Sequence, residues 1–424
     1  MRDKGIWKIL AILMALVLIG SCAAMPSVGD VSESEVKSSS SATIYVPDDY
    51  LTIQEAVNAA SAGDTIIVRD GTYTENVEVD KRLTIRSENG SDSTIVQAAN
   101  LSNPTFEVSA DGVNISGLTV KNPQPELPLI PIEHINKSIG GLTVKNPVGH
   151  EIPSTPPIIE YNSLQHVVDH LMKEFPRIEE PFQPTPGKER ISIPIPISLG
   201  EGQGISLSGV RNVTITGNII EDCQRGINVS SSINVTVANN TIKSSIDSIF
   251  PVNLNCYGIR LYKSNDNGVS KNNCSNNRDG GIYLDSSHNN LITSNNCSNN
   301  NFTMYFFDIT TGRMEVVHYG NGISVRDSNN NIIYLNNFIN NGKNVDSRGS
   351  TNLWNSTEKI SYTYNGKTYT NYLGNYWDDY TGKDADGDGI GDIPYSINSD
   401  KDIHPLLKPY ENYRISTFSG GNAK

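Results

Sequence analysis

A tetrapeptide of the form Gly-Ile-x-Leu/Val recurs in this 424-residue chain, and the repeat limits the folds that are open to it. The five copies begin at Gly204, Gly226, Gly258, Gly281 and Gly322. Two intervals are 22 and 23 residues, and the other two, 32 and 41 residues, fit the same unit with segments inserted. Self-similarity at a fixed period predicts a stack of structural repeats.

Short apolar runs between turn residues precede the repeats and predict strands. They cover residues 43–46, 65–68, 76–79, 83–85, 94–96, 106–108 and 113–115. No helical crossover separates them, and the period near 22 leaves room for three short strands in each repeat. We therefore predict an all-β fold, a single-stranded parallel β-helix with three strands per repeat.

A short helix is predicted just after the first strand. Thr52-Ile-Gln-Glu55 has the pattern of a capping box. Ile53, Ala56, Val57 and Ala60 then form one apolar face, and Gly63-Asp64 ends the helix. Such a helix fits as a plug over the open end of a hydrophobic coil.

The N-terminus has the pattern of an export signal. Basic residues precede an apolar run at Ile9–Ile19, which is short for a membrane span. Ile19-Gly20-Ser21-Cys22 resembles a lipobox, so Cys22 is a candidate for lipidation, and the alternative is ordinary cleavage near Ala23-Ala24. We expect a signal at 1–24 and a Ser-rich tether at 25–42.

The rest of the chain divides into four segments by composition. We expect an N-terminal cap with the first repeats at 43–120, a Pro-rich insertion with one helix (164–175) at 121–203, repeats at 204–345 and a C-terminal cap at 346–424. Proline cannot donate a ladder hydrogen bond, so most of the insertion cannot be interior strand.

Charge narrows the range of partners. The net charge is −13 and the pI about 5.0, which argues against nucleic acid and anionic membrane surfaces. We expect an exported, cell-surface protein that touches the membrane only through an N-terminal lipid. Glycosylation is open at a dense set of sequons, which includes Asn89, Asn114, Asn212, Asn234, Asn273 and Asn301.

The N-terminal motif and the tail resemble a known family. Residues 46–57 (VPDDYLTIQEAV), with Gly63-Asp-Thr65 and Gly71-Thr-Tyr-Thr-Glu75, are similar to the cap of pectin-lyase-like right-handed β-helices. The repeats and the tail from Gly374 to Asp392 resemble NosD-like proteins of the carbohydrate-binding and sugar hydrolysis (CASH) type, which are abundant on archaeal surfaces. The resemblance implies a right-handed coil and a sugar groove on one strand face.

Strand alternation selects candidate residues for that groove. Ile259 and Leu261 should point inward, so Arg260 and Tyr262 point outward. The same positions in later repeats add three residues to this outward patch: Tyr283, Asp285 and Arg326.

Two inserted segments, 245–255 and 302–320, precede Gly-Ile strands and should flank the patch from one corner. Aromatic and charged groups together suit carbohydrate. The alternative is a solvated strand face without a ligand.

Catalysis is not predicted. A glycosidase needs two carboxylates across the scissile bond, and only Asp285 is an outward acid of the patch. The polygalacturonase-type motifs are missing from the repeats. The alternatives to glycan binding are a structural envelope component and a polysaccharide lyase or hydrolase.

A calcium loop is predicted in the tail. Asp384, Asp386, Asp388 and Asp392 occupy positions 1, 3, 5 and 9 of an EF-hand-type pattern, and position 7 offers the Ile390 carbonyl. Position 12 is Tyr395 in place of the usual Glu, so Asp378, Asp379 or Asp400 would have to complete the shell. We expect a structural Ca²⁺ that fixes the C-terminal cap; the alternative is a solvated acidic turn.

Copper is not favoured, and the state of the cysteines is left open. The NosD resemblance raises copper, but the seven histidines are scattered, and His166 and His170 alone share a helical face. Cys274 and Cys297 lie at equivalent positions of consecutive repeats, where either a disulfide or a stack of reduced thiols fits.

Overall fold

A computed structural model describes residues 41–122, 202–243, 256–308, 313–398 and 400–415, with the side chains of 303–317 left out of the description. The predicted helix at 164–175, His166, His170 and the candidate lipidation site Cys22 lie outside these ranges. Among the helices of the described ranges, none is long and apolar enough to span a bilayer.

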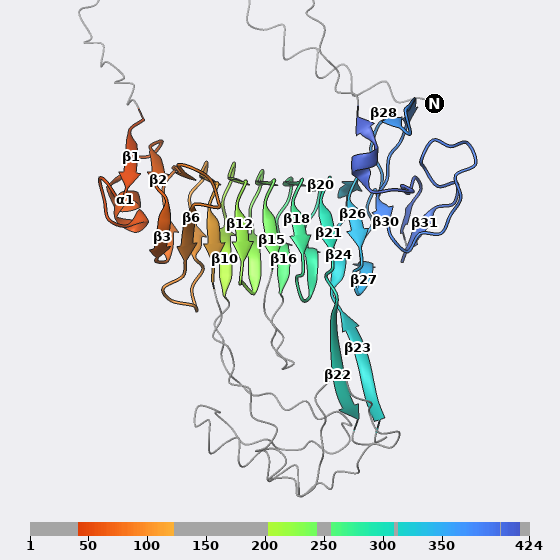
Figure 1. The fold of residues 1–424 in the computed structure, drawn as a ribbon, viewed down its shortest axis with the longest axis horizontal. Helices are drawn as coiled ribbons and strands as arrows, with labels where there is room; N and C mark the ends of the chain where they lie inside the picture. Colours follow the sequence, from red (N-terminus) through yellow and green to blue (C-terminus); the bar gives the residue numbers. More distant parts are fainter. Residues whose placement is uncertain (1–40, 123–201, 244–255, 309–312, 399, 416–424) are drawn as a thin grey trace, which may run out of the picture. The chain divides into compact units, whose positions relative to one another are not determined.

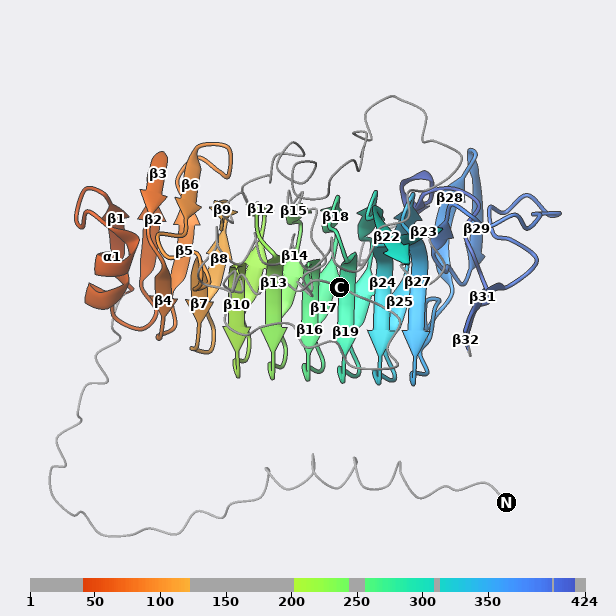
Figure 2. The ribbon, with the colours of Figure 1, turned by 90° about the horizontal axis from the view of Figure 1, so that it is seen from below.

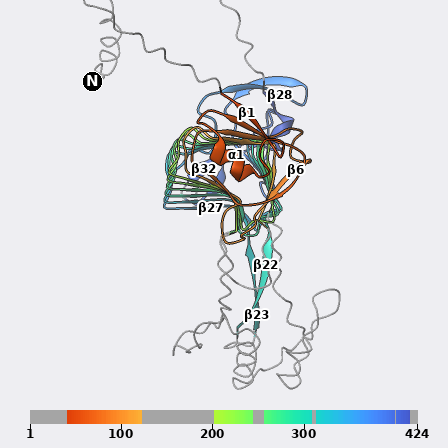
Figure 3. The same ribbon diagram turned by 90° about the vertical axis from the view of Figure 1, so that its left-hand side faces the viewer.

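Three parallel sheets stack their strands into a coil, as the repeat predicts (Figure 1). Each complete turn of the coil, here called a rung, contributes one strand to every sheet. Figure 3 shows the three sheets around one core, seen along the stack. The chain is a right-handed parallel β-helix.

Sheet A has the order β1-β2-β5-β8-β11-β14-β17-β20-β25. Its strands are β1 (Thr43–Val46), β2 (Thr65–Val68), β5 (Thr84–Ser87), β8 (Asn114–Ser116), β11 (Thr214–Thr216), β14 (Thr236–Ala238), β17 (Gly268–Ser270), β20 (Leu291–Thr293) and β25 (Ile332–Tyr334).

Sheet B has the order β3-β6-β9-β12-β15-β18-β21-β26-β30. Its strands are β3 (Gly71–Thr74), β6 (Thr94–Gln97), β9 (Thr119–Lys121), β12 (Ile219–Glu221), β15 (Thr241–Lys243), β18 (Asn273–Ser275), β21 (Asn296–Ser298), β26 (Asn337–Ile339) and β30 (Tyr376–Trp377).

Sheet C has the order β27-β24-β19-β16-β13-β10-β7-β4 and contains all five Gly-Ile motifs. Its strands are β4 (Val77–Val79), β7 (Phe106–Val108), β10 (Gln203–Ser208), β13 (Arg225–Ser230), β16 (Tyr257–Tyr262), β19 (Gly280–Asp285), β24 (Asn321–Arg326) and β27 (Lys343–Arg348).

The glycine of the Gly-Ile motif is required by close packing inside the coil. A Cβ atom on Gly281 would lie 2.8 Å from the Gly322 carbonyl oxygen and 2.9 Å from Cys297 Sγ. The following residue, Ile282, is fully buried in the core. The motif therefore corresponds to a tightly packed corner followed by a side chain that points into the core.

The predicted capping helix is confirmed as α1 (Ile53–Ala59), with both hydrogen bonds of the capping box present. Ile53, Ala56 and Val57 are fully buried against the first rung. The Glu75 carboxylate adds a second cap, because it accepts the backbone N–H groups of Ile53 and Gln54 at 2.9 and 2.8 Å. The helix ends at Ala59, before the predicted Gly63-Asp64 stop.

Buried asparagines connect the rungs through the corner between sheets A and B. Asn295 shows the pattern: its Oδ1 accepts the N–H and Nδ2 of Asn272, and its own Nδ2 donates to Asn336 Oδ1. The ladder formed in this way contains Asn218, Asn240, Asn272, Asn295, Asn336 and Asn375. Every member donates toward the C-terminal end of the coil.

A carboxylate ends this asparagine ladder. Asp402 is fully buried and accepts hydrogen bonds from Asn375 N, Asn375 Nδ2, Trp377 Nε1 and His404 N. A second ladder, which ends with Asn331 and Asn352, stops in the same way on Asp400. A carboxylate suits the end of a ladder of donors because it accepts hydrogen bonds without having to donate one.

The C-terminal cap adds small antiparallel elements and a second apolar cluster around Tyr362, Leu373 and Tyr413. The elements are β28 (Ile360–Tyr364), β29 (Lys367–Asn371), β31 (Tyr395–Ile397), β32 (Asp400–Asp402), the 3-10 helix η2 (Tyr410–Asn412) and β33 (Arg414–Ile415). Trp377 closes the coil, stacked between Phe338 and Tyr395 at 4.5 Å from each ring.

The structure decides between the two states that the sequence allows for the cysteines, a disulfide and a stack of reduced thiols. Cys274 and Cys297 are register partners on adjoining strands of sheet B, and both are free and buried. They form a stack of reduced thiols inside the coil.

Candidate functional site

The outer face of sheet C carries the predicted outward patch on three adjoining strands, β16, β19 and β24. Arg260 pairs in register with Tyr283, Tyr262 pairs with Asp285, and Asp285 pairs in turn with Arg326. Figure 2 shows β16, β19, β24 and β27 side by side. Adjoining strands lie about 4.8 Å apart, so these five side chains share one patch.

The predicted alternation is borne out by burial. Ile259 and Leu261 are fully buried in the core, whereas Arg260 and Tyr262 are partly exposed. Arg326 is exposed on β24.

The aromatic rings of the patch are covered by neighbouring side chains. Tyr283 is only 8% exposed, and its ring stacks on Tyr257 at 4.6 Å. The Tyr262 ring has the Arg260 guanidinium at 4.6 Å and the Lys263 ammonium at 5.0 Å from its centroid. Outward side chains one rung apart are close enough to pack on each other, so these rings do not form an open platform for a sugar.

The polar groups of the patch are held in place by short-range contacts. Arg260 Nη1 donates to Asn228 Oδ1 at 3.3 Å. Asp285 accepts hydrogen bonds from the Tyr283 hydroxyl at 3.2 Å and the Ser286 hydroxyl at 3.0 Å. Burial lowers the pKa of Arg260, and the nearby Arg225 charge adds to this effect.

Both predicted insertions leave the coil at the corner between sheets B and C. Residues 244–255 follow β15 of sheet B and precede β16 of sheet C. The second insertion contains an antiparallel hairpin, β22 (Phe302–Asp308) and β23 (Arg313–Tyr319), between β21 and β24. Figure 3 shows the hairpin extending from this corner of the coil.

The Pro-rich insertion leaves the coil at the same corner, because it separates β9 of sheet B from β10 of sheet C. All three insertions therefore follow a strand of sheet B and precede a strand of sheet C.

One strand of this face carries no repeat signal that predicted it from the sequence. β27 pairs in register with β24 and brings Asp346 and Arg348 onto the outer face. It has no Gly-Ile motif, and the signal that remains is Val345, which takes the place of the buried isoleucine.

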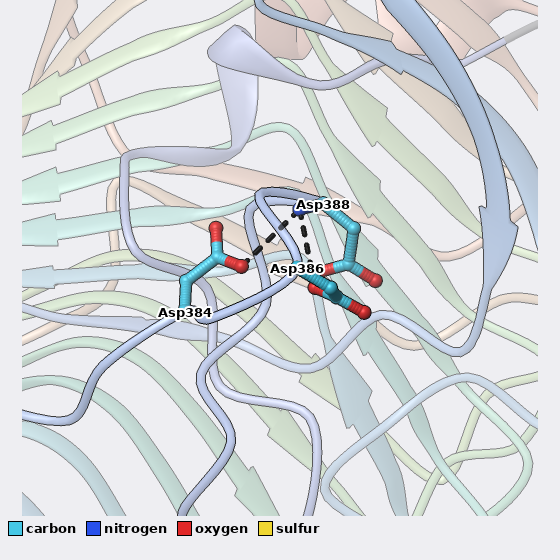
Figure 4. A group of neighbouring side chains, drawn as sticks. All are labelled: Asp384, Asp386 and Asp388. Carbon is cyan, nitrogen blue, oxygen red and sulfur yellow. Dashed lines mark hydrogen bonds between the residues drawn. The ribbon is translucent and has the colours of Figure 1, made fainter.

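The acidic loop brings three of its predicted ligands together. Carboxylate oxygens of Asp384, Asp386 and Asp388 lie within 4.8 Å of one another (Figure 4). Gly387 N and Gly389 N donate to Asp384 at 2.7 and 2.8 Å. The N–H of Asp388 favours the ionised form of Asp386, but the charges of Asp388 and Asp384 oppose it, and the pKa of Asp386 is raised.

Two further residues of the predicted calcium loop form hydrogen bonds within it. Asp392 Oδ2 accepts the Ala385 N–H at 2.9 Å and is not part of the three-carboxylate group. Ile390 N donates to Asp388 Oδ1 at 2.8 Å.

The three acids proposed to complete the shell lie outside the three-carboxylate group and accept hydrogen bonds from other residues. Asp378 and Asp379 accept hydrogen bonds from the Asn344 amide, and Asp400 accepts the Asn352 N–H and the Trp354 indole N–H. The three clustered carboxylates are therefore the ligands that the structure offers together for a cation.

A family model matches the repeats. The model of the family described as "Periplasmic copper-binding protein (NosD)" matches residues 197–382. The β-helix repeats are NosD-like. The chain has no match among curated proteins.

Solved structures with similar folds are distant in sequence. Pectate lyase Pel9A is 12% identical with a TM-score of 0.41, and the match covers 72% of this chain. This chain spans slightly less than two thirds (64%) of the lyase. The polygalacturonase from Erwinia carotovora is 13% identical with a TM-score of 0.38, covering 78% of each chain. An alginate lyase from Paenibacillus is 13% identical with a TM-score of 0.31, covering 73% of this chain and 95% of the lyase.

The described residues of these NosD-like repeats do not fit a copper ion, which takes imidazole and sulfur ligands. The cysteines are buried in the coil, and burial raises the pKa of Cys256 to about 12, so its thiol stays protonated. His288 Nδ1 accepts the Asn329 N–H at 3.0 Å. In the described ranges, the acidic loop is the one group of three or more His, Cys, Asp or Glu ligand atoms, and its hard oxygens suit Ca²⁺ rather than copper.

Proposed function

We propose that this protein is an exported β-helix protein that binds polysaccharide or glycan on the outer face of sheet C. The observation that carries the proposal is the strand register, which places Arg260, Tyr283, Asp285 and Arg326 on adjoining strands of sheet C. Guanidinium groups donate to sugar oxygens in pairs, and a carboxylate accepts from sugar hydroxyls.

Binding is a better fit to this face than hydrolysis. Asp285 is the only carboxylate of the predicted patch, whereas glycoside hydrolysis uses two. A second acid on this face, Asp346 of β27, forms ion pairs with Lys343 at 2.9 Å and Arg348 at 3.0 Å. Burial raises the pKa of Asp346, but these two cations outweigh it and the pKa is lowered, so Asp346 is poorly suited to donate a proton.

A glycan array with one variant and a matched control tests the site. Arg326→Ala removes an exposed guanidinium from the face, and we expect it to reduce binding about tenfold or more. Arg86→Ala removes another exposed arginine, from β5 of sheet A, and should leave binding unchanged. An array without any bound glycan, or equal affinities for the parent and Arg326→Ala, would contradict the proposal.

We also propose that the acidic loop binds Ca²⁺ and thereby stabilises the C-terminal cap. The support is the cluster of three carboxylates, of which Asp386 is exposed and Asp388 is buried against Asn371. Three like charges within 4.8 Å repel one another without a cation.

Thermal unfolding tests the calcium proposal. We expect Ca²⁺ to raise the Tm relative to EGTA, because a ligand that binds only the folded state stabilises it. Asp384→Asn should abolish that shift, whereas Asp92→Asn, in a distant turn, should retain it. A Tm that does not respond to EGTA in the parent protein would refute an occupied stabilising site.

A further inference from the structure

The outer face of sheet C changes its charge along the stack of strands. The first two strands, β4 and β7, present the exposed acids Glu78 and Glu107 and no cation. The five strands β13, β16, β19, β24 and β27 carry two acids, Asp285 and Asp346. They carry five cations: Arg225, Arg260, Arg326, Lys343 and Arg348. One end of this face is thus positive in a protein whose net charge is −13.

Two arginines of the positive end lie near the Asp285 carboxylate without forming an ion pair with it. Among the described residues, no carboxylate forms an ion pair with Arg260 or Arg326, although Lys343 and Arg348 share Asp346. Arg260 is half-buried and is oriented by the Tyr262 ring and by Asn228, yet that single hydrogen bond uses one of its five N–H donors. Guanidinium groups held in place with free donors match carboxylate, sulfate or phosphate oxygens.

The covered aromatic rings point to the same conclusion. A neutral sugar is recognised mainly by its apolar ring face on an aromatic side chain and by hydroxyl hydrogen bonds. Here Tyr283 is 8% exposed against Tyr257, and the Tyr262 ring is covered by Arg260 and Lys263. The groups that remain accessible to a ligand are mostly charged.

We infer that the glycan of the proposed function is anionic and that its acidic groups bind Arg260 and Arg326. This inference rests on the proposed glycan binding at sheet C. The two arginines lie on β16 and β24, two strand spacings apart, so about 10 Å separates their strands along the stack. A polymer with repeated acidic groups, laid along the stack, would reach both. Asp285, between them in the stack, would accept hydrogen bonds from sugar hydroxyls.

Matched pairs of acidic and neutral polymers test the inference. The probes are polygalacturonate against its methyl ester, and dextran sulfate against dextran. We expect the purified protein to bind one or both acidic polymers at least tenfold more tightly than the neutral form, with an affinity that falls as salt rises. Non-specific attraction is not a concern, because the net charge of −13 repels polyanions.

Two variants separate the local site from the overall charge. Arg260→Gln and Arg326→Gln should each weaken binding of the acidic polymer about 10- to 100-fold, the range for one charge-assisted hydrogen bond to a buried or oriented group. Arg86→Gln changes the net charge by the same amount on sheet A and should have no effect.

Failure of this inference is distinguishable from failure of the proposed function. Equal, salt-independent binding of the neutral and acidic polymers, still weakened by Arg326→Gln, would overturn the anionic ligand and keep glycan binding at sheet C. Acidic binding that is unaffected by either glutamine variant would overturn the assignment to these arginines. Absence of binding to all four polymers, together with an empty glycan array, would overturn both.

Discussion

The asparagine ladder provides the sharpest test of how this coil is held together, and Asn295 is its best-placed member. It is fully buried and takes part in hydrogen bonds in both directions along the stack. Its Oδ1 accepts two hydrogen bonds from Asn272 at 3.0 and 2.9 Å, and its Nδ2 donates to Val269 O and Asn336 Oδ1, both at 2.9 Å.

Asn295→Ala removes these contacts at once. Two N–H donors of Asn272 lose their acceptor in the interior, where water cannot replace it. Each unpaired buried donor costs about 1–3 kcal/mol, so we expect the free energy of unfolding to fall by about 2–6 kcal/mol.

The adjacent residue is a matched control. Asn296 has the same side chain but points outward, where it is half-buried and donates at 3.2 Å to Asn273 and 3.3 Å to Ser298. Asn296→Ala should cost about 1 kcal/mol or less, because water replaces the lost partners.

Urea unfolding followed by circular dichroism gives the two free energies, and hydrogen exchange at the Asn272 amide gives a local readout. We expect this amide to exchange faster in Asn295→Ala alone. Equal destabilisation by the two variants, with unchanged exchange at Asn272, would refute the view that the buried ladder stabilises the coil.

Two further changes test the packing and the end of the coil. Gly281→Ala should destabilise the protein by about 1–3 kcal/mol, because the new Cβ would lie 2.9 Å from Cys297 Sγ; Gly268→Ala, which meets nothing within 4 Å, is the control in a urea titration. Asp402→Asn should cost about 1–3 kcal/mol, because an amide NH₂ would face one of the four N–H donors that the carboxylate accepts. Burial raises the pKa of Asp402 to about 7, so this unfolding measurement belongs at pH 8.5, where the carboxyl group is ionised. A variant as stable as the parent at that pH would contradict the role of the carboxylate.

Periodicity along the chain determined the coil. The Gly-Ile spacing predicted parallel strands at a fixed register, and the register of β16, β19 and β24 follows it. The pattern was readable because each repeat must satisfy the same tight corner and the same inward isoleucine. The capping box of α1 was readable for a similar reason, since all its contacts lie within a few residues.

Contacts between rungs were decided by the tertiary structure. The sequence shows pairs of asparagines, such as Asn295 and Asn296, but not which member turns inward to form the ladder. It shows Asp402 as one acid among many, although this residue alone receives the last amide of that ladder. The hydrogen-bond partner of such a residue lies one rung away. Its distance along the sequence depends on the length of the insertion in that rung.

In the candidate site, too, the sequence pattern determined some features and tertiary contacts determined others. Alternation along a strand determined that Arg260, Tyr262 and Arg326 lie outward, because side chains on a strand point to opposite faces in turn. The tertiary structure decided that Tyr283 is covered by Tyr257, since lateral packing between neighbouring strands is invisible to a pattern that runs along one strand. The repeat thus located the face, and contacts between rungs decided which of its side chains remain open to a ligand.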